Sequence, residues 1–179
     1  MSRRSRTPYV LLGLLATESM SGYDLKAAVG RTVGHFWSES YGQLYPTLRR
    51  LEEEGALVSR QEDGGRRARV VYSITPQGRE MLANWLDRTP APALPRNELL
   101  LKLFFGFFAP PERTRRLLEE GLARFQTEAA RLAHIEREVR EQTPDAPERL
   151  YWLLTIDLGR RLADAKIAWA RAALRRLPE

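Results

Sequence analysis

The sequence predicts a mainly α-helical protein with one small β-hairpin. Three observations carry this prediction. Apolar residues recur three and four apart through most of the chain, they alternate with polar residues after Gly55, and helical spacing returns beyond a proline-rich stretch at 89–95. Three short helices followed by a hairpin have the order of a winged helix-turn-helix domain. With 179 residues and 43% hydrophobic content, the chain can fill the core of one ordinary domain or of two small ones.

Two helices are predicted at the start of the chain. Thr7 begins the first, with Pro8 in the first helical position, where the missing N–H of proline has no intrahelical partner to lose. Ser21 is the N-cap candidate of the second helix, and Gly30 or Gly34 can close it. The apolar sides of the two helices consist of Val10, Leu11, Leu14, Leu15, Leu25, Ala28 and Val29.

Residues 36–51 are predicted to form a third helix with a divided surface. Its apolar stripe consists of Trp37, Tyr41, Leu44, Leu48 and Leu51. The opposite face consists of Gly42, Gln43, Pro46, Arg49 and Arg50. Ser38 or Ser40 is the expected N-cap, and Gly55 is the expected stop. Pro46 conflicts with one continuous helix, because a proline deletes a backbone hydrogen bond. Either the regular helix begins later, or its first turns are irregular.

A basic hairpin and a fourth helix complete the first half. Residues 57–61 and 69–74 are predicted strands, and Glu62-Asp63-Gly64-Gly65 is the predicted turn. In the second strand, three apolar side chains share one face: Val70, Tyr72 and Ile74. Thr75-Pro76 then opens a helix that ends before the proline-rich stretch.

The second half is predicted to be wholly helical. Asn97 can cap a run from Glu98 to Phe108, and Pro111 can start a long helix that reaches about Gln142. A last helix runs from Pro147 to about Arg176. The apolar seam of the long helix consists of Leu118, Leu122, Phe125, Ala129, Leu132, Ile135 and Val139. The last helix has one strip through Leu154, Leu158, Leu162, Ala165, Trp169 and Ala172, and another through Leu153, Ile156, Ile167 and Leu174.

These two helices carry more apolar surface than a single helical hairpin can cover. Pairing with a second copy of the chain buries such stripes, and a bundle within one chain is the alternative; we favour the homodimer. The expected dimerisation residues are Leu118, Leu122, Phe125, Leu132, Ile135, Leu158, Leu162 and Trp169. Two domains follow: a winged helix-turn-helix over residues 1–90 and an all-helical dimerisation domain over residues 96–179.

Composition narrows the choice of partner. A net charge of +6 favours an acidic partner, but charge alone does not separate nucleic acid from a membrane surface or from a role in solubility. The absence of cysteine fits a reducing cytoplasm, so a cytoplasmic location is expected. Residues 1–16 imitate a signal peptide, but the small-residue cleavage pattern does not follow. The apolar run 99–109 is far shorter than the roughly 20 residues of a membrane span, and we expect no membrane partner.

The third helix and the hairpin supply candidate contacts to double-stranded DNA. In helix-turn-helix proteins the second helix of the motif enters the major groove and presents its N-terminal residues to base edges. Gln43 can pair with adenine, the Tyr45 hydroxyl can reach a phosphate, and the arginines suit phosphates. A solvated helix face and a solubilising hairpin tip are the plain alternatives. The candidate residues are Ser38, Ser40, Gln43, Tyr45, Pro46, Arg49, Arg50, Arg66, Arg67 and Arg69.

Several ordered motifs in this sequence resemble the PadR family of bacterial transcriptional regulators. They are Leu11-Gly13-Leu14-Leu15, Ser21-Gly22-Tyr23-Asp24-Leu25, the run Trp37, Ser40, Gly42, Leu44-Tyr45-Pro46, Leu48 and Leu51, and then Arg69, Tyr72, Ile74-Thr75 and Gly78. The segment Leu101-Lys102-Leu103-Phe104-Phe105-Gly106 before two long helices resembles the longer-tailed PadR branch, whose tail is similar to the C-terminal domain of a virulence-gene activator.

This resemblance implies a homodimer, held together by its C-terminal helices, that binds an inverted-repeat operator, most often as a repressor. Some relatives are released by phenolic acids or hydrophobic drugs. A small hydrophobic or aromatic effector is therefore a candidate partner. Trp152 and Trp169 could line a cavity for it, although aromatic residues at helical spacing are more often core.

Nothing in the sequence favours an enzyme. The two histidines, His35 and His134, lie in separate segments, and no cysteine or spaced carboxylate arrangement accompanies them. We therefore expect no catalytic residue, no metal and no cofactor. Two alternatives to a sequence-specific regulator stay open: an architectural protein that binds DNA by charge alone, and a helical module for protein–protein interaction.

Overall fold

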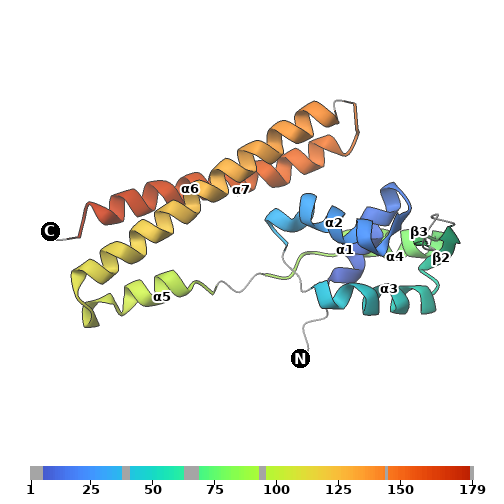
Figure 1. The fold of residues 1–179 in the computed structure, drawn as a ribbon, viewed down its shortest axis with the longest axis horizontal. Coiled ribbons are helices and arrows are strands. Elements are labelled where there is room, and N and C mark those ends of the chain that lie inside the picture. Colours follow the sequence, from blue (N-terminus) through green and yellow to red (C-terminus); the bar gives the residue numbers. More distant parts are fainter. Residues whose placement is uncertain (1–5, 38–40, 63–68, 93–95, 144, 178–179) are drawn as a thin grey trace. The chain divides into compact units, whose positions relative to one another are not determined.

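The computed structural model describes residues 6–37, 41–62, 69–92, 96–143 and 145–177. The chain forms two compact units, Met1–Pro92 and Ala93–Glu179 (Figure 1). Four candidate DNA contacts lie outside the described residues: Ser38, Ser40, Arg66 and Arg67.

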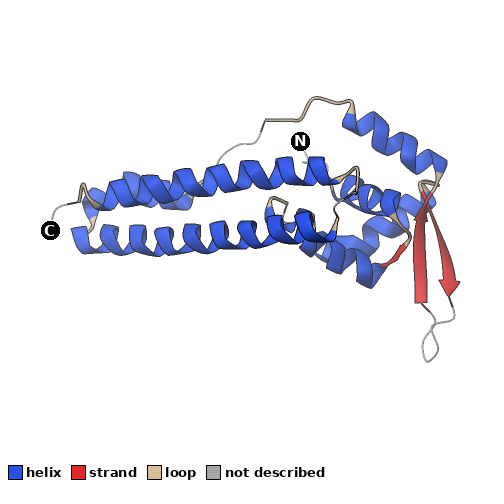
Figure 2. Ribbon diagram, turned by 90° about the horizontal axis from the view of Figure 1, so that it is seen from above, coloured by secondary structure: helices blue, strands red, loops and turns tan. Residues whose placement is uncertain are grey.

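The N-terminal unit combines short helices with a small antiparallel sheet. Its helices are α1 (Thr7–Thr17), α2 (Gly22–Arg31), α3 (Leu44–Glu53) and α4 (Pro76–Leu86), and its 3₁₀ turns are η1 (Val33–His35) and η2 (Tyr41–Gln43). Its strands are β1 (Met20–Ser21), β2 (Leu57–Glu62) and β3 (Arg69–Ile74), of which β2 and β3 form the hairpin drawn in red in Figure 2. This order of elements confirms the predicted winged helix-turn-helix.

Local hydrogen bonds explain where α2 begins and ends. Ser21 caps the helix as predicted: its hydroxyl accepts from the Asp24 amide, and the Asp24 carboxylate accepts from the Ser21 amide. The predicted stop at Gly30 or Gly34 is wrong, because the helix ends at Arg31 with Thr32 as its C-cap. The Thr32 hydroxyl donates to the Ala28 carbonyl at 2.8 Å, so a threonine satisfies the last turn without a glycine.

The conflict around Pro46 is resolved by a late start of α3. The chain passes through the 3₁₀ turn η2, and the regular helix begins at Leu44 with Gln43 as its N-cap. The prediction that Ser38 or Ser40 caps this helix is therefore wrong. Pro46 falls in the first helical turn, where its missing N–H removes no intrahelical hydrogen bond.

The predicted stop of α3 at Gly55 is confirmed. Gly55 has a φ of 71°, the left-handed region that glycine tolerates best. Its amide donates to the Glu52 carbonyl at 2.9 Å, and the Ala56 amide donates to the Leu51 carbonyl at 2.8 Å. These two bonds form a Schellman motif, which turns the chain directly into β2.

The sheet contains a strand that the periodicity did not predict. Its order is β1-β3-β2, and both pairings are antiparallel. The short β1 pairs Met20 with Tyr72 and Ser21 with Val71, so the segment before α2 joins the hairpin. Beyond Val71, toward the hairpin tip, β3 pairs only with β2.

One core holds the N-terminal unit together. Seven buried side chains from all three of the first helices and from β2 are at most 2% exposed: Leu11, Leu12, Leu15, Leu25, Leu48, Leu51 and Leu57. Gly78 on α4 lies so close to the end of α3 that an added Cβ would stand 2.2 Å from the Ala56 carbonyl oxygen. This backbone contact packs α4 against the turn that joins α3 to β2.

The C-terminal unit is a helical hairpin with a short helix before it. Its elements are α5 (Glu98–Phe104), the 3₁₀ turn η3 (Gly106–Phe108), α6 (Pro111–Gln142) and α7 (Arg149–Leu174). Asn97 caps α5, as predicted, by accepting from the Leu100 amide at 3.2 Å. The bounds of α6 agree with the predicted ones, and α6 and α7 lie side by side in Figures 1 and 2.

Small residues and ion pairs hold α6 against α7. The side chains buried between them include Leu118, Leu132, Ile156, Ala163 and Ala170, each at most 2% exposed. Gly159 lets α7 approach Leu132, whose Cδ1 would stand 3.2 Å from an added Cβ. Glu136 pairs with Arg140 on its own helix at 2.7 Å and with Arg160 on α7. These pairs, through the hydrogen bond from Arg140 first, lower the pKa of Glu136 below its ordinary value.

Candidate nucleic-acid interface

The predicted division of the third helix is present in α3. Leu44, Thr47, Leu48 and Leu51 are buried against the core. Five residues are exposed on the other side, four of them polar or basic: Gln43, Tyr45, Pro46, Arg49 and Arg50. Because Gln43 is the N-cap, its exposed side chain stands at the end of the helix that base-reading helices present to the groove.

Tyr45 is held in place by a glycine on α2. The residue is 56% exposed, yet an added Cβ on Gly22 would stand 2.7 Å from the Tyr45 Cε1 atom. A side chain at this position would force the Tyr45 ring to move. Tyr45 is therefore oriented by packing on one edge and remains open to a partner on the other.

The two arginines of α3 differ in their surroundings. The Nε atom of Arg50 lies 3.6 Å from the Oε1 atom of Glu54, and this carboxylate compensates part of the arginine charge. Within the described residues, Arg49 has no ion pair with a carboxylate. Glu52 accepts a 2.5 Å hydrogen bond from the Ser59 hydroxyl on β2, so this carboxylate is turned toward the hairpin. Arg49 is thus the more available cation on the exposed face.

Tyr72 lies on β3 within reach of the same charges. Burial raises the pKa of Tyr72 first, and the neighbouring Glu52 and Tyr45 raise it further, against a smaller opposite effect of Arg49. The phenol therefore stays protonated at neutral pH. It adds no negative charge to the surface beside α3.

Arg69, the last candidate of the hairpin, is held by a carboxylate. Its guanidinium donates to Asp24 at the start of α2 and forms an ion pair there. The hydroxyl of Ser21 first, and then the charge of Arg69, lower the pKa of Asp24 below its ordinary value. Arg69, a predicted DNA contact, is therefore paired with α2 in the DNA-free chain.

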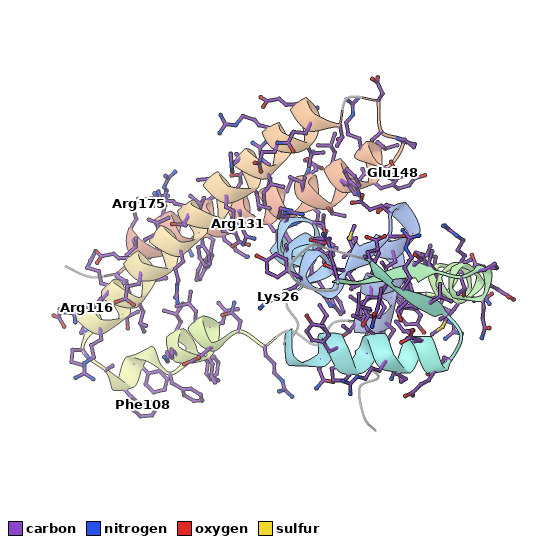
Figure 3. All side chains as sticks on the ribbon, turned by 45° about the vertical axis from the view of Figure 1, so that its right-hand side comes forward. Lys26, Phe108, Arg116, Arg131, Glu148 and Arg175 are labelled. Carbon is purple, nitrogen blue, oxygen red and sulfur yellow. The ribbon has the colours of Figure 1, made fainter. Side chains whose placement is uncertain are left out.

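The C-terminal unit exposes many large apolar side chains. On α5 and η3, six are at least 50% exposed: Leu100, Leu101, Phe104, Phe105, Phe107 and Phe108, the last of which is labelled in Figure 3. On α7, five are at least 51% exposed: Leu150, Tyr151, Leu154, Leu158 and Leu162. Trp152 and Trp169 are 37% and 39% exposed, so neither is a core residue within the single chain.

The predicted dimerisation residues therefore fall into two groups. Leu118 and Leu132 are buried inside the chain, and Leu122, Phe125 and Ile135 are half-buried. These five residues lie on the face of α6 that packs within the unit. That placement agrees with the alternative of a bundle within one chain. Leu158, Leu162 and Trp169 are the exposed group.

Two family descriptions match almost the whole described chain. Residues 11–84 match the transcriptional regulator PadR-like family, and residues 95–178 match the virulence activator α C-terminal family. The chain belongs to the PadR-like family of transcriptional regulators. This is a family of regulators and not of enzymes, in agreement with the expectation from the sequence.

One curated PadR-like relative is the negative transcriptional regulator PadR of Bacillus subtilis. It is 35% identical over 99 residues, which cover 54% of each chain. The chain therefore spans about half the length of this curated relative.

Solved structures of PadR-like proteins share the fold over almost the full chain. Bacillus subtilis PadR in complex with operator DNA gives a TM-score of 0.85 at 23% identity and covers 99% of this chain and 100% of that one. The same protein in complex with p-coumaric acid gives 0.77 at 25% identity, covering 95% and 98%. The Vibrio cholerae virulence activator AphA gives 0.76 at 27% identity, covering 94% and 96%.

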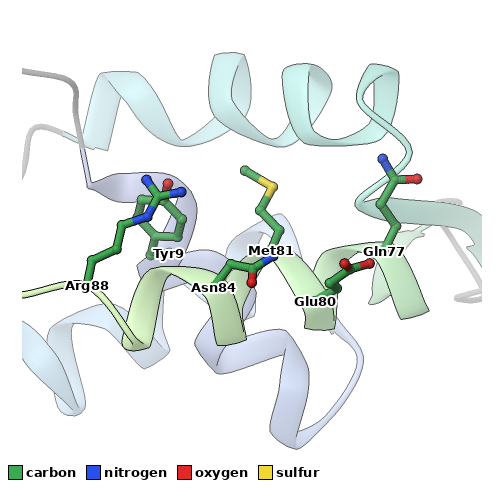
Figure 4. Close-up of a pocket in the computed structure, with 6 residues that line it drawn as sticks. All are labelled: Tyr9, Gln77, Glu80, Met81, Asn84 and Arg88. Carbon is green, nitrogen blue, oxygen red and sulfur yellow. The ribbon is translucent and has the colours of Figure 1, made fainter.

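A shallow cavity of about 280 Å³ on the N-terminal unit has a mixed polar lining: Tyr9, Gln77, Glu80, Met81, Asn84 and Arg88 (Figure 4). In the described part of the chain, no three potential ligands gather as a metal site would require. No described helix is long and apolar enough to cross a membrane.

The sequence did not lead us to predict a role for two residues that position the candidate interface, Asp24 and Gly22. The capping role of Asp24 was predictable, because Ser21-x-x-Asp24 has the spacing of a capping box. Gly22 orients Tyr45 across two helices. No local pattern signals that contact, because the two residues are far apart in the sequence.

Proposed function

We propose that this PadR-like chain is a sequence-specific DNA-binding regulator, and a repressor, that binds an inverted-repeat operator as a homodimer. The observation that carries the proposal is the exposed face of α3, which begins with Gln43 and continues through Tyr45 and Arg49. The buried leucines of the same helix anchor it to the core. A helix held this rigidly can present side chains to base edges in a fixed register.

The residues on that face suit different parts of a duplex. Gln43 can make a bidentate contact with adenine, which is where sequence preference would arise. Tyr45 and Arg49 suit phosphate oxygens, and such contacts set position and affinity but carry little sequence information. Ser38, Ser40, Arg66 and Arg67 stay sequence-based predictions. The operator complex of the Bacillus subtilis relative supports the assignment of the partner.

The exposed apolar surface of the C-terminal unit supports a homodimer. Soluble monomers rarely expose contiguous apolar patches of this kind. The patch on α5 and η3 includes four phenylalanines in five positions, and the stripe on α7 continues through Leu158 and Leu162. Two chains related by a two-fold axis would present two copies of α3 to two half-sites. Trp169 belongs to the same exposed surface and would be covered with it.

Repression and an effector complete the proposal. The Bacillus subtilis relative is named a negative regulator, and its complex with p-coumaric acid supports a small aromatic acid as effector class. Trp152 and Trp169 are partly exposed on α7 and would report a nearby ligand. Titration of p-coumaric acid should quench tryptophan fluorescence and release bound DNA together; quenching without release would remove the effector from the proposal.

Selection of bound fragments from random genomic DNA tests this function. We expect enrichment of a palindrome whose half-site centres lie about one helical turn, or a multiple of it, apart. Equal affinity for the enriched duplex and its scrambled version, with a steep salt dependence, would favour the architectural alternative. No binding to any duplex would favour the protein-interaction alternative.

A further inference from the structure

The ion pair between Asp24 and Arg69 lies where the sheet is least supported. The ladder between β1 and β3 ends at Val71, and a hydrogen bond of 2.7 Å between the Ser19 and Ser73 hydroxyls reinforces it on the side away from the tip. Arg69 lies two residues closer to the tip, where β3 pairs only with β2. A two-stranded segment alone is marginally stable in water.

Arg69 faces an acidic residue in the ladder, yet its ion pair is with α2. Glu62 is its direct partner in the β2–β3 register. Glu62 instead accepts from Arg60 on its own strand at 2.6 Å, and the Arg69 guanidinium reaches Asp24. The ion pair therefore joins the outer part of the hairpin to the helix that precedes α3.

Hydrogen bonds at the start of α2 orient the Asp24 carboxylate for this contact. The Ser21 amide and hydroxyl both donate to the Oδ2 atom of Asp24, at 3.2 and 2.9 Å, and Arg69 donates to the same oxygen, so the Ser21 cap orients the acceptor of the ion pair. The β1–β3 ladder holds Ser21 itself opposite Val71. Ser21 and Asp24 together thus link the cap of α2, the short strand β1 and the outer part of β3.

We propose that Arg69 is a positioning residue, whose ion pair with Asp24 fixes the outer part of the hairpin relative to α2 and so sets how the wing meets DNA. This inference rests on the proposed function, because it concerns the wing of the same DNA interface. The alternative is that Arg69 contacts a phosphate directly and that Asp24 competes for it. The two roles predict opposite effects of removing the Asp24 charge.

Asp24→Asn separates the two roles by the sign of its effect. Asparagine keeps an acceptor oxygen for the Ser21 amide but loses the charge that holds Arg69. If Arg69 positions the wing, binding to the duplex enriched by fragment selection should weaken about three- to fivefold, the scale of a surface ion pair. If Arg69 is a phosphate anchor, loss of a competing negative charge should tighten binding instead.

Glu62→Gln is the matched control, because it removes a negative charge from the same hairpin without touching the link to α2. Arg69→Gln and the double variant with Asp24→Asn complete a cycle, and Arg69→Lys tests rescue by a retained charge. We expect the double variant to bind no more weakly than the weaker single variant, and Arg69→Lys to bind better than Arg69→Gln.

Hydrogen exchange of the DNA-free protein provides a readout that does not depend on the proposed function. Asp24→Asn should speed exchange in peptides covering β2 and β3, whereas Glu62→Gln should not. Unchanged exchange, or binding by Asp24→Asn as tight as that of Glu62→Gln or tighter, would overturn the positioning role. Failure of the wild-type protein to prefer the enriched duplex over a scrambled one would instead overturn the proposed function.

Discussion

The two units of this chain bury their apolar residues to very different extents. In the N-terminal unit, a continuous core of leucines is almost fully buried, and the exposed face of α3 is mainly polar and basic. In the C-terminal unit, α6 and α7 bury a narrow seam and leave large apolar side chains exposed on α5, η3 and α7. The first unit is complete as a single chain, and the second presents a surface that water does not favour.

This difference fits the separate task that the proposed function gives to each unit. A unit with a closed core can hold a recognition helix rigidly and offer its polar face to DNA. A unit with an open apolar surface would bury it in the proposed homodimer, since the burial of apolar surface is the main driving force of most protein association. The predictions below test this division of tasks.

The largest effect is expected from charges placed on the exposed stripe of α7. Leu158→Asp together with Leu162→Asp should weaken self-association at least about 100-fold, because two charges would enter an apolar interface. Light scattering over a range of protein concentrations measures this. Leu86→Asp is the matched control: this leucine is 66% exposed on α4 of the other unit, and its replacement should leave the oligomeric state unchanged.

Replacement of a helical glycine by alanine should lower the free energy of unfolding more in the N-terminal unit than in the C-terminal unit. Gly78→Ala should lower the free energy of unfolding by about 2–3 kcal/mol, because the new Cβ would meet the Ala56 carbonyl oxygen of the backbone. Gly159→Ala should stay within about 1 kcal/mol, because its Cβ meets only the flexible end of Leu132 while alanine favours the helix. Urea unfolding of both variants provides the comparison, and equal losses would contradict it.

The sequence predicted those parts of the fold that local chemistry decides. Pro111 and the Thr143-Pro144 break bound α6, Thr75 caps α4 through the Gly78 amide, and Gly55 ends α3 with a positive φ. Each of these signals depends on one or two residues and needs no tertiary contact.

The features that the sequence did not predict depend on tertiary contacts between distant residues. The strand β1 has two residues and exists only because β3 pairs with it. On α7, the predicted strip through Leu153, Ile156, Ile167 and Leu174 is the more buried one. Ala163 and Ala170 are fully buried beside it although neither predicted strip included them, and their small size allows close approach of α6. The ion pair of Arg69 with Asp24 joins residues 45 positions apart, so sequence spacing could not show which basic residue was already held.

Removal of one base-reading side chain should affect specific binding alone. Gln43→Ala should weaken binding to the enriched duplex about tenfold, since a bidentate base contact contributes about 1–3 kcal/mol, and leave binding to a scrambled duplex unchanged. Fluorescence anisotropy with both duplexes measures this. An equal loss on both would mean that Gln43 supports DNA binding without reading sequence.

The two arginines of α3 should differ by a smaller amount. Arg49→Ala should weaken binding to both duplexes about threefold and reduce the slope of log affinity against log salt by about 1. Arg50→Ala should do less, because Glu54 already compensates part of the Arg50 charge. A larger effect for Arg50 would reverse our assignment of the available cation.

The smallest effect concerns an ion pair of the C-terminal unit. Because the folded pKa of Glu136 is lowered, its contribution to stability is fully present above the unfolded pKa and is lost as pH falls through the lower folded pKa. Glu136→Gln should lower the melting temperature by about 2 °C at pH 7 and by less in acid. If the variant still melts at a lower temperature than wild type after the carboxylate is protonated, Glu136 stabilises the unit by packing and not by its charge.

The most direct test of the division of tasks is DNA binding by the variant with Leu158→Asp and Leu162→Asp. The account predicts that its N-terminal unit stays folded, that wild-type protein binds the enriched inverted repeat as two chains per duplex, and that the variant binds the same duplex at least about 100-fold more weakly. Binding of the monomeric variant as tight as that of wild type would contradict the account, because the C-terminal unit would then contribute nothing to operator recognition.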